Sequence, residues 1–154
     1  MKRITTLSFF MLLCWITAFA IPRAEYPRPQ FERNAWINLN GEWTYSFDFG
    51  GSGLEREWFK STGFDQKITV PFCPESKLSG VEYKDFINHM WYHRIISIPQ
   101  DWADKQVLLH FGAVYYKSEI YIDGVFAARH FGGTSSFQVD ITPYVKAGQT
   151  HNLV

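Results

Sequence analysis

The chain has 154 residues, of which 46% are hydrophobic, and its 15 basic side chains balance 15 acidic ones. A chain of this length forms one domain of ordinary size, and its apolar share is too high for a disordered protein. Zero net charge excludes the basic excess that nucleic-acid binding requires, so no nucleic-acid partner is expected.

The first twenty residues have the composition of an export signal. Met1-Lys2-Arg3 is a short cationic start, residues 4–20 are mostly apolar, and Ala18-Phe19-Ala20 has the small-x-small form that signal peptidase accepts. A permanent membrane anchor is less favoured because hydroxyl side chains interrupt the run. A lipoprotein signal is disfavoured by the large Leu13 before Cys14. We expect cleavage after residue 20, no membrane association afterwards, and a bacterial periplasmic or secreted protein.

Removal of residues 1–20 changes the charge and the cysteine count. It leaves 134 residues with 13 basic and 15 acidic side chains, and Cys73 as the sole thiol. An exported domain with one cysteine has no internal disulfide, so a hydrophobic core must stabilise it. Cys73 has no cationic neighbour in the sequence to stabilise a thiolate, and a nucleophilic role is therefore disfavoured.

The first regular element is expected after an extended lead-in over residues 21–37. From residue 43 apolar and polar side chains alternate, which places Asp48 on the polar face of a strand. Asn40-Gly41 before it and residues 50–53 after it have turn composition. Burial of the four aromatic rings on the apolar face of this strand would contribute at most about 6 to 12 kcal/mol to the stability of the fold. A position in the core is therefore favoured over a sugar-stacking platform. The four rings belong to Trp43, Tyr45, Phe47 and Phe49.

Further short strands, separated by turns, are predicted along the rest of the chain. Asp123-Gly124 is the strongest local signal, because this pair supplies the positive φ angles of a tight hairpin turn. A helical turn is expected over residues 54–60. The strands are expected over residues 67–70, 89–98, 106–111, 119–122, 125–130, 137–141 and 152–154. This pattern is typical of an all-β fold, an antiparallel β-sandwich or jelly roll. The strand that begins at Asn152 predicts a sandwich that is incomplete at its C-terminus.

Candidate catalytic groups are few. His89 and His93 are four residues apart, but on a strand they would lie about 13 Å from each other, too far to share a metal ion. His130 with Gly132-Gly133 is expected to form a turn, because no helix start follows. The sequence has no Gly-x-Ser-x-Gly elbow and no phosphate-binding loop. We therefore predict no catalytic residue, no metal site and no cofactor in this segment.

An ordered series of short segments runs through the chain. It comprises Leu39-Asn40-Gly41-Glu42-Trp43, the run from Val70 to Gly80, Trp91-Tyr92-His93-Arg94, Leu109 to Val114, Ile120 to Gly124, and His130 to Gly133 followed by Phe137 and Asp140-Ile141-Thr142. In this order the segments resemble the N-terminal sugar-binding domain of glycoside hydrolase family 2, the β-galactosidase and β-glucuronidase group. The resemblance covers residues 38–154 and departs at His93, where many members have arginine.

The resemblance implies a galactose-binding-domain-like jelly roll that precedes an immunoglobulin-like domain and a (β/α)8 barrel. Family members are retaining β-glycosidases whose two catalytic glutamates lie in the barrel. The chain would then be a truncated, non-catalytic part of a glycoside hydrolase, inactive by itself. Its expected partners are a β-glycoside substrate and its own downstream barrel, and a homo-oligomer stays open.

The loop from Phe72 to Asn88 is expected to border the substrate pocket of the complete enzyme. The candidate residues are Glu75, Asp85 and Asn88 for hydrogen bonds to sugar hydroxyls, and Tyr83 and Phe86 for an apolar face. Packing of the loop on the barrel is the alternative for any one of them.

A free-standing carbohydrate-binding module or lectin with the same fold is the alternative function. That function needs an exposed aromatic platform and no hydrolase activity. A cell-surface adhesin, the third hypothesis, has no motif in its favour.

Overall fold

The computed structural model describes residues 21–26, 30 and 32–154, so the predicted export signal lies outside the described residues. The strands are β1 (Gly41–Phe47), β2 (Gln66–Val70), β3 (Met90–Ser97), β4 (Leu108–Phe111), β5 (Lys117–Ile122), β6 (Val125–Phe131), β7 (Phe137–Asp140) and β8 (Thr150–Leu153). Short 3-10 helices are η2 (Trp58–Lys60), η3 (Lys77–Ser79), η4 (Gln100–Trp102) and η5 (Thr142–Tyr144). The predicted strands all occur, with their ends shifted by one or two residues.

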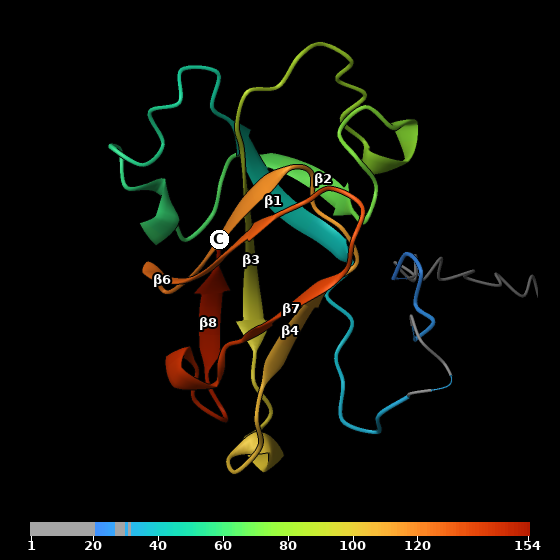
Figure 1. The fold of residues 1–154 in the computed structure, drawn as a ribbon, viewed down its shortest axis with the longest axis vertical. Helices are drawn as coiled ribbons and strands as arrows, with labels where there is room; N and C mark the ends of the chain where they lie inside the picture. The colour runs from blue at the N-terminus through green and yellow to red at the C-terminus, as the bar shows by residue number, and fades with distance from the viewer. Residues whose placement is uncertain (1–20, 27–29, 31) are drawn as a thin grey trace, which may run out of the picture.

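Two antiparallel sheets form the domain (Figure 1). The larger sheet has the strand order β2-β1-β3-β8-β5-β6, and the smaller one pairs β4 with β7. All strand pairs in the two sheets are antiparallel. The predicted all-β sandwich is confirmed.

The core lies between the two sheets. It is built of aliphatic side chains that are at most 7% exposed: Ile96, Ile98, Val107, Leu109, Ile120, Ile122, Val139, Ile141 and Leu153. Each such burial contributes roughly 1.5 to 3 kcal/mol. Cys73 is a free, exposed thiol. In the described part of the chain, this aliphatic core is a main source of the stability of the domain.

The aromatic face of β1 is only partly buried. Tyr45 is 6% exposed and Trp43 packs against the core, as predicted. The strand ends at Phe47, and beyond it the predicted alternation is wrong. Phe49 is 50% exposed, whereas Asp48, expected on the polar face, is 5% exposed. The chain turns after Phe47, so a side chain's position in the sequence no longer sets the face that it occupies.

The predicted Asp123-Gly124 hairpin is confirmed. The two residues have φ angles of 48° and 79°, and Ile122 lies opposite Val125 across the turn. Asp123 also ties this turn to β8. Its Oδ1 accepts from the backbone N–H of Asn152 at 2.7 Å, and its Oδ2 lies 2.6 Å from Nδ1 of His151.

His151 joins the hairpin to a second turn. It is 6% exposed, and its Nε2 accepts from the backbone N–H of Lys146 at 3.0 Å. The proton of the neutral ring therefore lies on Nδ1 and is donated to Asp123. Burial alone would raise the pKa of Asp123, but hydrogen bonds from Asn152 and His151 outweigh it and hold the pKa below its ordinary value.

Acid is expected to loosen this connection. Because the folded-state pKa of Asp123 is lowered, its contribution is complete above the unfolded value of about 3.9 and is lost as pH falls through the folded value. Asp123→Asn keeps the turn geometry but removes the acceptor for His151, and should lower the free energy of unfolding by about 2 kcal/mol at pH 7. Urea unfolding at pH 7 and pH 3 measures both effects.

The control for this prediction is Asp104→Asn, an exposed residue. It should unfold like the parent at both pH values. The loss of stability between pH 7 and pH 3 should be smaller in Asp123→Asn than in the parent. An equal loss in the two proteins would contradict the assignment.

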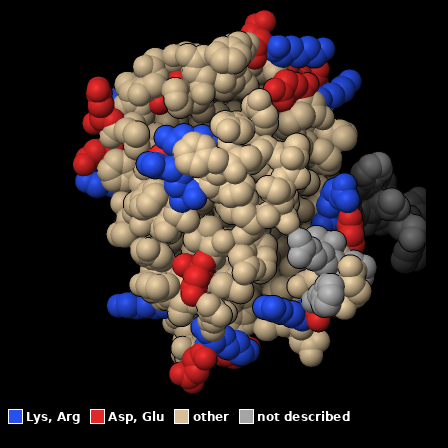
Figure 2. Space-filling model, in the orientation of Figure 1, with Lys and Arg blue, Asp and Glu red and all other residues tan. Residues whose placement is uncertain are grey.

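Charged side chains of both signs lie mainly toward the edges of the face in Figure 2, whose centre is largely uncharged. In the part of the chain that the structure describes, no helix has the length and apolar character needed to cross a membrane.

Candidate functional site

The loop between β2 and β3, residues 72–88, has a defined backbone structure. Ser76 caps η3, because its Oγ accepts from the backbone N–H of Leu78 at 3.1 Å. Ser79 is 1% exposed; its hydroxyl donates to the Ser76 carbonyl at 2.7 Å and accepts from the Val81 N–H at 3.1 Å. Hydrogen bonds within the loop therefore hold residues 76–81. Residues 72–88 as a whole are called the rim loop below.

Tyr83 anchors the rim loop to β1. Its ring centroid lies 4.7 Å from that of Phe47 and 5.9 Å from that of Phe49. Its backbone N–H donates to the carbonyl of Pro74 at 3.0 Å, which closes the loop on itself. Tyr83, a candidate for an apolar sugar-binding face, is half-buried, and its ring packs on those of Phe47 and Phe49.

Asn88 anchors the other end of the rim loop. Its amide Nδ2 donates to the carbonyl of Phe49 at 3.3 Å. One residue later, the carbonyl of His89 accepts from the backbone N–H of Asp48 at 2.9 Å. The end of the rim loop and the turn after β1 are therefore held side by side.

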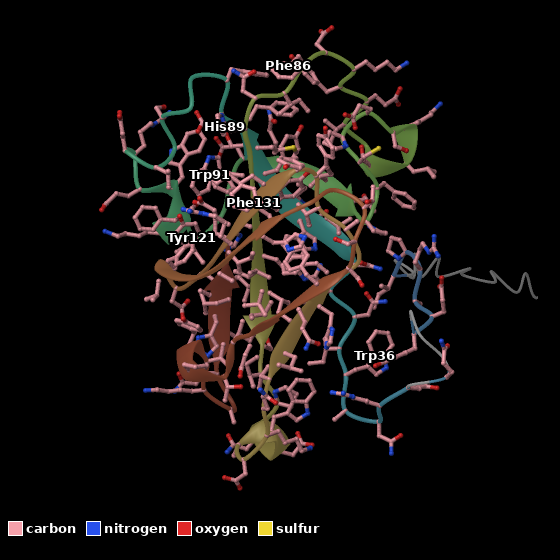
Figure 3. All side chains as sticks on the ribbon, viewed as in Figure 1. Trp36, Phe86, His89, Trp91, Tyr121 and Phe131 are labelled. Atoms are coloured by element: carbon pink, nitrogen blue, oxygen red, sulfur yellow. The ribbon has the colours of Figure 1, made fainter. Side chains whose placement is uncertain are left out.

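The other three candidates are exposed. Phe86, labelled near the top of Figure 3, is 82% exposed, and Glu75 and Asp85 are exposed as well. Burial raises the pKa of the Tyr92 phenol, and the nearby charge of Glu75 raises it further. Glu75 thus lies close to a phenol of β3. Four of the five candidates, Glu75, Asp85, Phe86 and Asn88, are therefore exposed, and only Tyr83 is half-buried. Tyr83 and Asn88 also have contacts that connect the rim loop to the segment of β1 and the turn after it.

Asp48 is the polar residue that sequence reasoning missed. Its carboxylate accepts from the backbone N–H groups of Ser52 at 2.9 Å and Gly53 at 2.8 Å, and from Nε1 of Trp91 at 3.1 Å. Burial would raise the pKa of Asp48, but these hydrogen bonds and the charge of His89 lower it overall. The Gly-rich segment directly after Asp48 was the available signal, since aspartate commonly accepts from backbone N–H groups in turns.

His93 and His130 pack against neighbouring strands, whereas His89 is exposed. His93 is 4% exposed, and its ring nitrogens lie 3.3 Å from Oγ1 of Thr44 and 3.0 Å from Oδ1 of Asn152. His130 stacks on Phe137 with a centroid distance of 4.0 Å. Within residues 21–26, 30 and 32–154, no three His, Cys, Asp or Glu side chains are grouped so that they could hold a metal ion.

The two packed antiparallel sheets define a β-sandwich domain of the jelly-roll class. Residues 37–154 match the family described as "Glycosyl hydrolases family 2, sugar binding domain". Because the match covers most of the chain, the chain belongs to this family.

Several relatives are similar to the chain over most of its length. β-Glucuronidase of Felis catus is 30% identical over 135 residues, which cover 80% of this chain and 20% of that protein. β-Glucuronidase of Streptococcus agalactiae serotype V is 30% identical over 114 residues, covering 74% and 18%. β-Galactosidase of Thermoanaerobacter pseudethanolicus is 27% identical over 131 residues, covering 77% and 16%. The chain spans about a fifth of the length of the relatives that it matches.

Solved structures agree with these relatives. The crystal structure of Ruminococcus gnavus β-glucuronidase superimposes with a TM-score of 0.63 at 25% identity, covering 75% of this chain and 20% of that one. The same enzyme in complex with D-glucuronic acid has the same TM-score, identity and coverage.

Proposed function

We propose that the chain is the N-terminal, non-catalytic domain of a retaining β-glycosidase that hydrolyses O-glycosidic bonds. The observation that carries the proposal is the family match over residues 37–154, which joins this chain to relatives that are β-glucuronidases or β-galactosidases. The catalytic groups would belong to a downstream barrel, and this chain would supply part of the substrate rim.

The favoured substrate is a β-D-glucuronide. Two of the three relatives described above are β-glucuronidases, and the similar R. gnavus structure includes a complex with D-glucuronic acid. The relative from T. pseudethanolicus makes a β-galactoside the second choice.

The rim loop has two groups of residues in this proposal. Glu75, Asp85 and Phe86 are exposed and would contact the substrate. Tyr83 is half-buried and Asn88 is exposed, and both would position the loop through their contacts with Phe47 and Phe49. Substitution of an exposed residue should change KM without changing the stability of the domain. Substitution of an anchor should lower the unfolding midpoint.

The test uses the product of the whole open reading frame, which this proposal expects to continue past the Val154 codon into a catalytic barrel. It should hydrolyse a chromogenic β-D-glucuronide, while the chain alone should not. Glu75→Ala and Asp85→Ala should each raise KM, while Asp104→Ala, also exposed, should not. Unchanged kinetics in both rim variants would leave the loop with a purely structural role, and a stop codon directly after Val154 would count against the whole proposal.

Export is the second part of the proposal. The cationic start, the apolar run and Ala18-Phe19-Ala20 support cleavage after residue 20 and a periplasmic or secreted enzyme. N-terminal sequencing of the protein recovered outside the cytoplasm should begin at Ile21. A protein that begins at Met1 and stays with the cells would contradict export.

A further inference from the structure

Three aromatic rings stand exposed together where β5 begins and β6 ends. Tyr115 is 86% exposed, Tyr116 is 59% exposed and Phe131 is 57% exposed. The ring centroids of Tyr115 and Tyr116 lie 5.8 Å apart, and those of Tyr116 and Phe131 lie 6.3 Å apart. The three residues are called the aromatic platform below. Exposed apolar groups gathered in this way mark interaction sites on globular proteins.

The backbone holds the aromatic platform in place. The N–H of Gly132 donates to the carbonyl of Tyr116 at 2.8 Å, which joins the two segments. Gly133 lies directly against the ring of Tyr115, where an added Cβ would overlap the ring and approach its Cε2 at 3.1 Å. The backbone segments that carry the three rings are therefore held next to each other before any ligand arrives, which reduces the entropy lost on binding.

A contact between His130 of β6 and Phe137 of β7 sets the orientation of the end of β6. His130 stacks on Phe137 of β7 with a centroid distance of 4.0 Å and an interplanar angle of 13°. Because adjacent side chains of a strand point to opposite faces, this contact turns Phe131, labelled in Figure 3, outward. The exposure of Phe131 is thus a consequence of the strand geometry.

The size of the aromatic platform decides between classes of ligand. With about 200 Å² for each fully exposed aromatic side chain, the three rings present about 400 Å². A stable protein interface needs about 800 Å² from each partner, twice this area. A short oligosaccharide is of the right size, and its C–H faces, which carry partial positive charge, complement the negative faces of aromatic rings.

We propose that Tyr115, Tyr116 and Phe131 form a non-catalytic binding site for a soluble oligosaccharide. Successive rings are inclined by 56° and 65°, so the three rings do not form one flat surface. The platform should therefore bind short, flexible chains in preference to the flat surface of a crystalline polysaccharide. Lys117, the nearest cation in sequence, forms an ion pair with Glu119 at 2.9 Å. Because its charge is already paired, we expect the site to recognise the pyranose rings and not charged groups, and we expect the affinity to depend little on salt concentration.

The experiment is a calorimetric titration of the purified chain with cellopentaose, a β-1,4-galacto-oligosaccharide and a chondroitin hexasaccharide. At least one should bind, with affinity in the millimolar range or tighter. Tyr115→Ala, Tyr116→Ala and Phe131→Ala should each weaken binding roughly tenfold. Ile95→Ala is the control, because Ile95 is 58% exposed on β3 and should bind like the parent. Unchanged unfolding midpoints would show that each variant is folded.

A pair of glycine variants tests the role of the platform's geometry. Gly133→Ala should weaken binding because the added methyl displaces Tyr115, whereas Gly112→Ala, with no atom within 4 Å of the added Cβ, should not.

Several outcomes would overturn the proposal: no binding of any of the three probes, binding unchanged in all platform variants, or binding lost in Phe86→Ala instead. Concentration-dependent self-association that disappears in the platform variants, without saccharide binding, would assign the surface to a protein interface. None of these outcomes depends on hydrolysis by the complete enzyme, so they leave the proposed function independently testable.

Discussion

Asp48→Ala is expected to lower the free energy of unfolding by about 3 kcal/mol, because it leaves one buried and two partly buried donors without their acceptor. Asp48 is 5% exposed and accepts from Ser52, Gly53 and Trp91. Loss of these bonds should release the turn after β1 and, with it, the anchored end of the rim loop. Urea unfolding followed by Trp fluorescence measures the effect.

Two further variants separate the carboxylate's role from the general effect of substitution. Asp48→Asn keeps one oxygen acceptor and should lose less stability than Asp48→Ala. Asp65→Ala removes an exposed carboxylate and should stay within about 0.5 kcal/mol of the parent. If Asp48→Ala unfolded at the same urea concentration as Asp65→Ala, the buried hydrogen bonds would contribute little to stability.

Gly53→Ala is expected to cost about 3 kcal/mol by steric overlap. An added Cβ would overlap Nε1 of Trp91, lie 2.6 Å from its Cε2 and lie 2.7 Å from Oδ2 of Asp48. Neither group can move freely, because the two are hydrogen-bonded to each other. The melting temperature should fall by more than 10 °C for a domain of this size, at roughly 4 °C or more per kcal/mol.

Gly50→Ala is the matched control in the same turn. An added Cβ at Gly50 has no atom within 4 Å, and Gly50 is not among the glycines with positive φ. Its melting temperature should stay near that of the parent or rise slightly, since alanine restricts the unfolded chain. Equal losses in Gly50→Ala and Gly53→Ala would mean that flexibility of the turn matters more than the packing of Trp91.

The strands could be predicted because their signals are local. Alternation marks β1, and Asp123-Gly124 alone specifies the hairpin between β5 and β6. The burial of Asp48 could not be predicted in the same way, because one of its partners, Trp91, is 43 residues away. Phe49 was misplaced because alternation does not reveal where a strand ends.

The candidate sites show the same limit. Sequence reasoning selected the rim loop but could not separate its anchors from its exposed residues, since Tyr83 is distinguished only by its contacts with Phe47 and Phe49. The aromatic platform was not predicted at all. Tyr116 and Phe131 are brought together by strand pairing across 15 residues of chain, and nothing in either segment alone indicates that its ring is exposed.

The position of β8 affects how the larger sheet folds. β8 is last in the chain, yet it lies between β3 and β5 in the larger sheet. Without β8, strands β2-β1-β3 and the β5–β6 hairpin have no hydrogen-bonded link within that sheet. The larger sheet can therefore close only when a segment far along the chain from β3 is inserted between β3 and β5, and such pairing between distant segments makes folding slow.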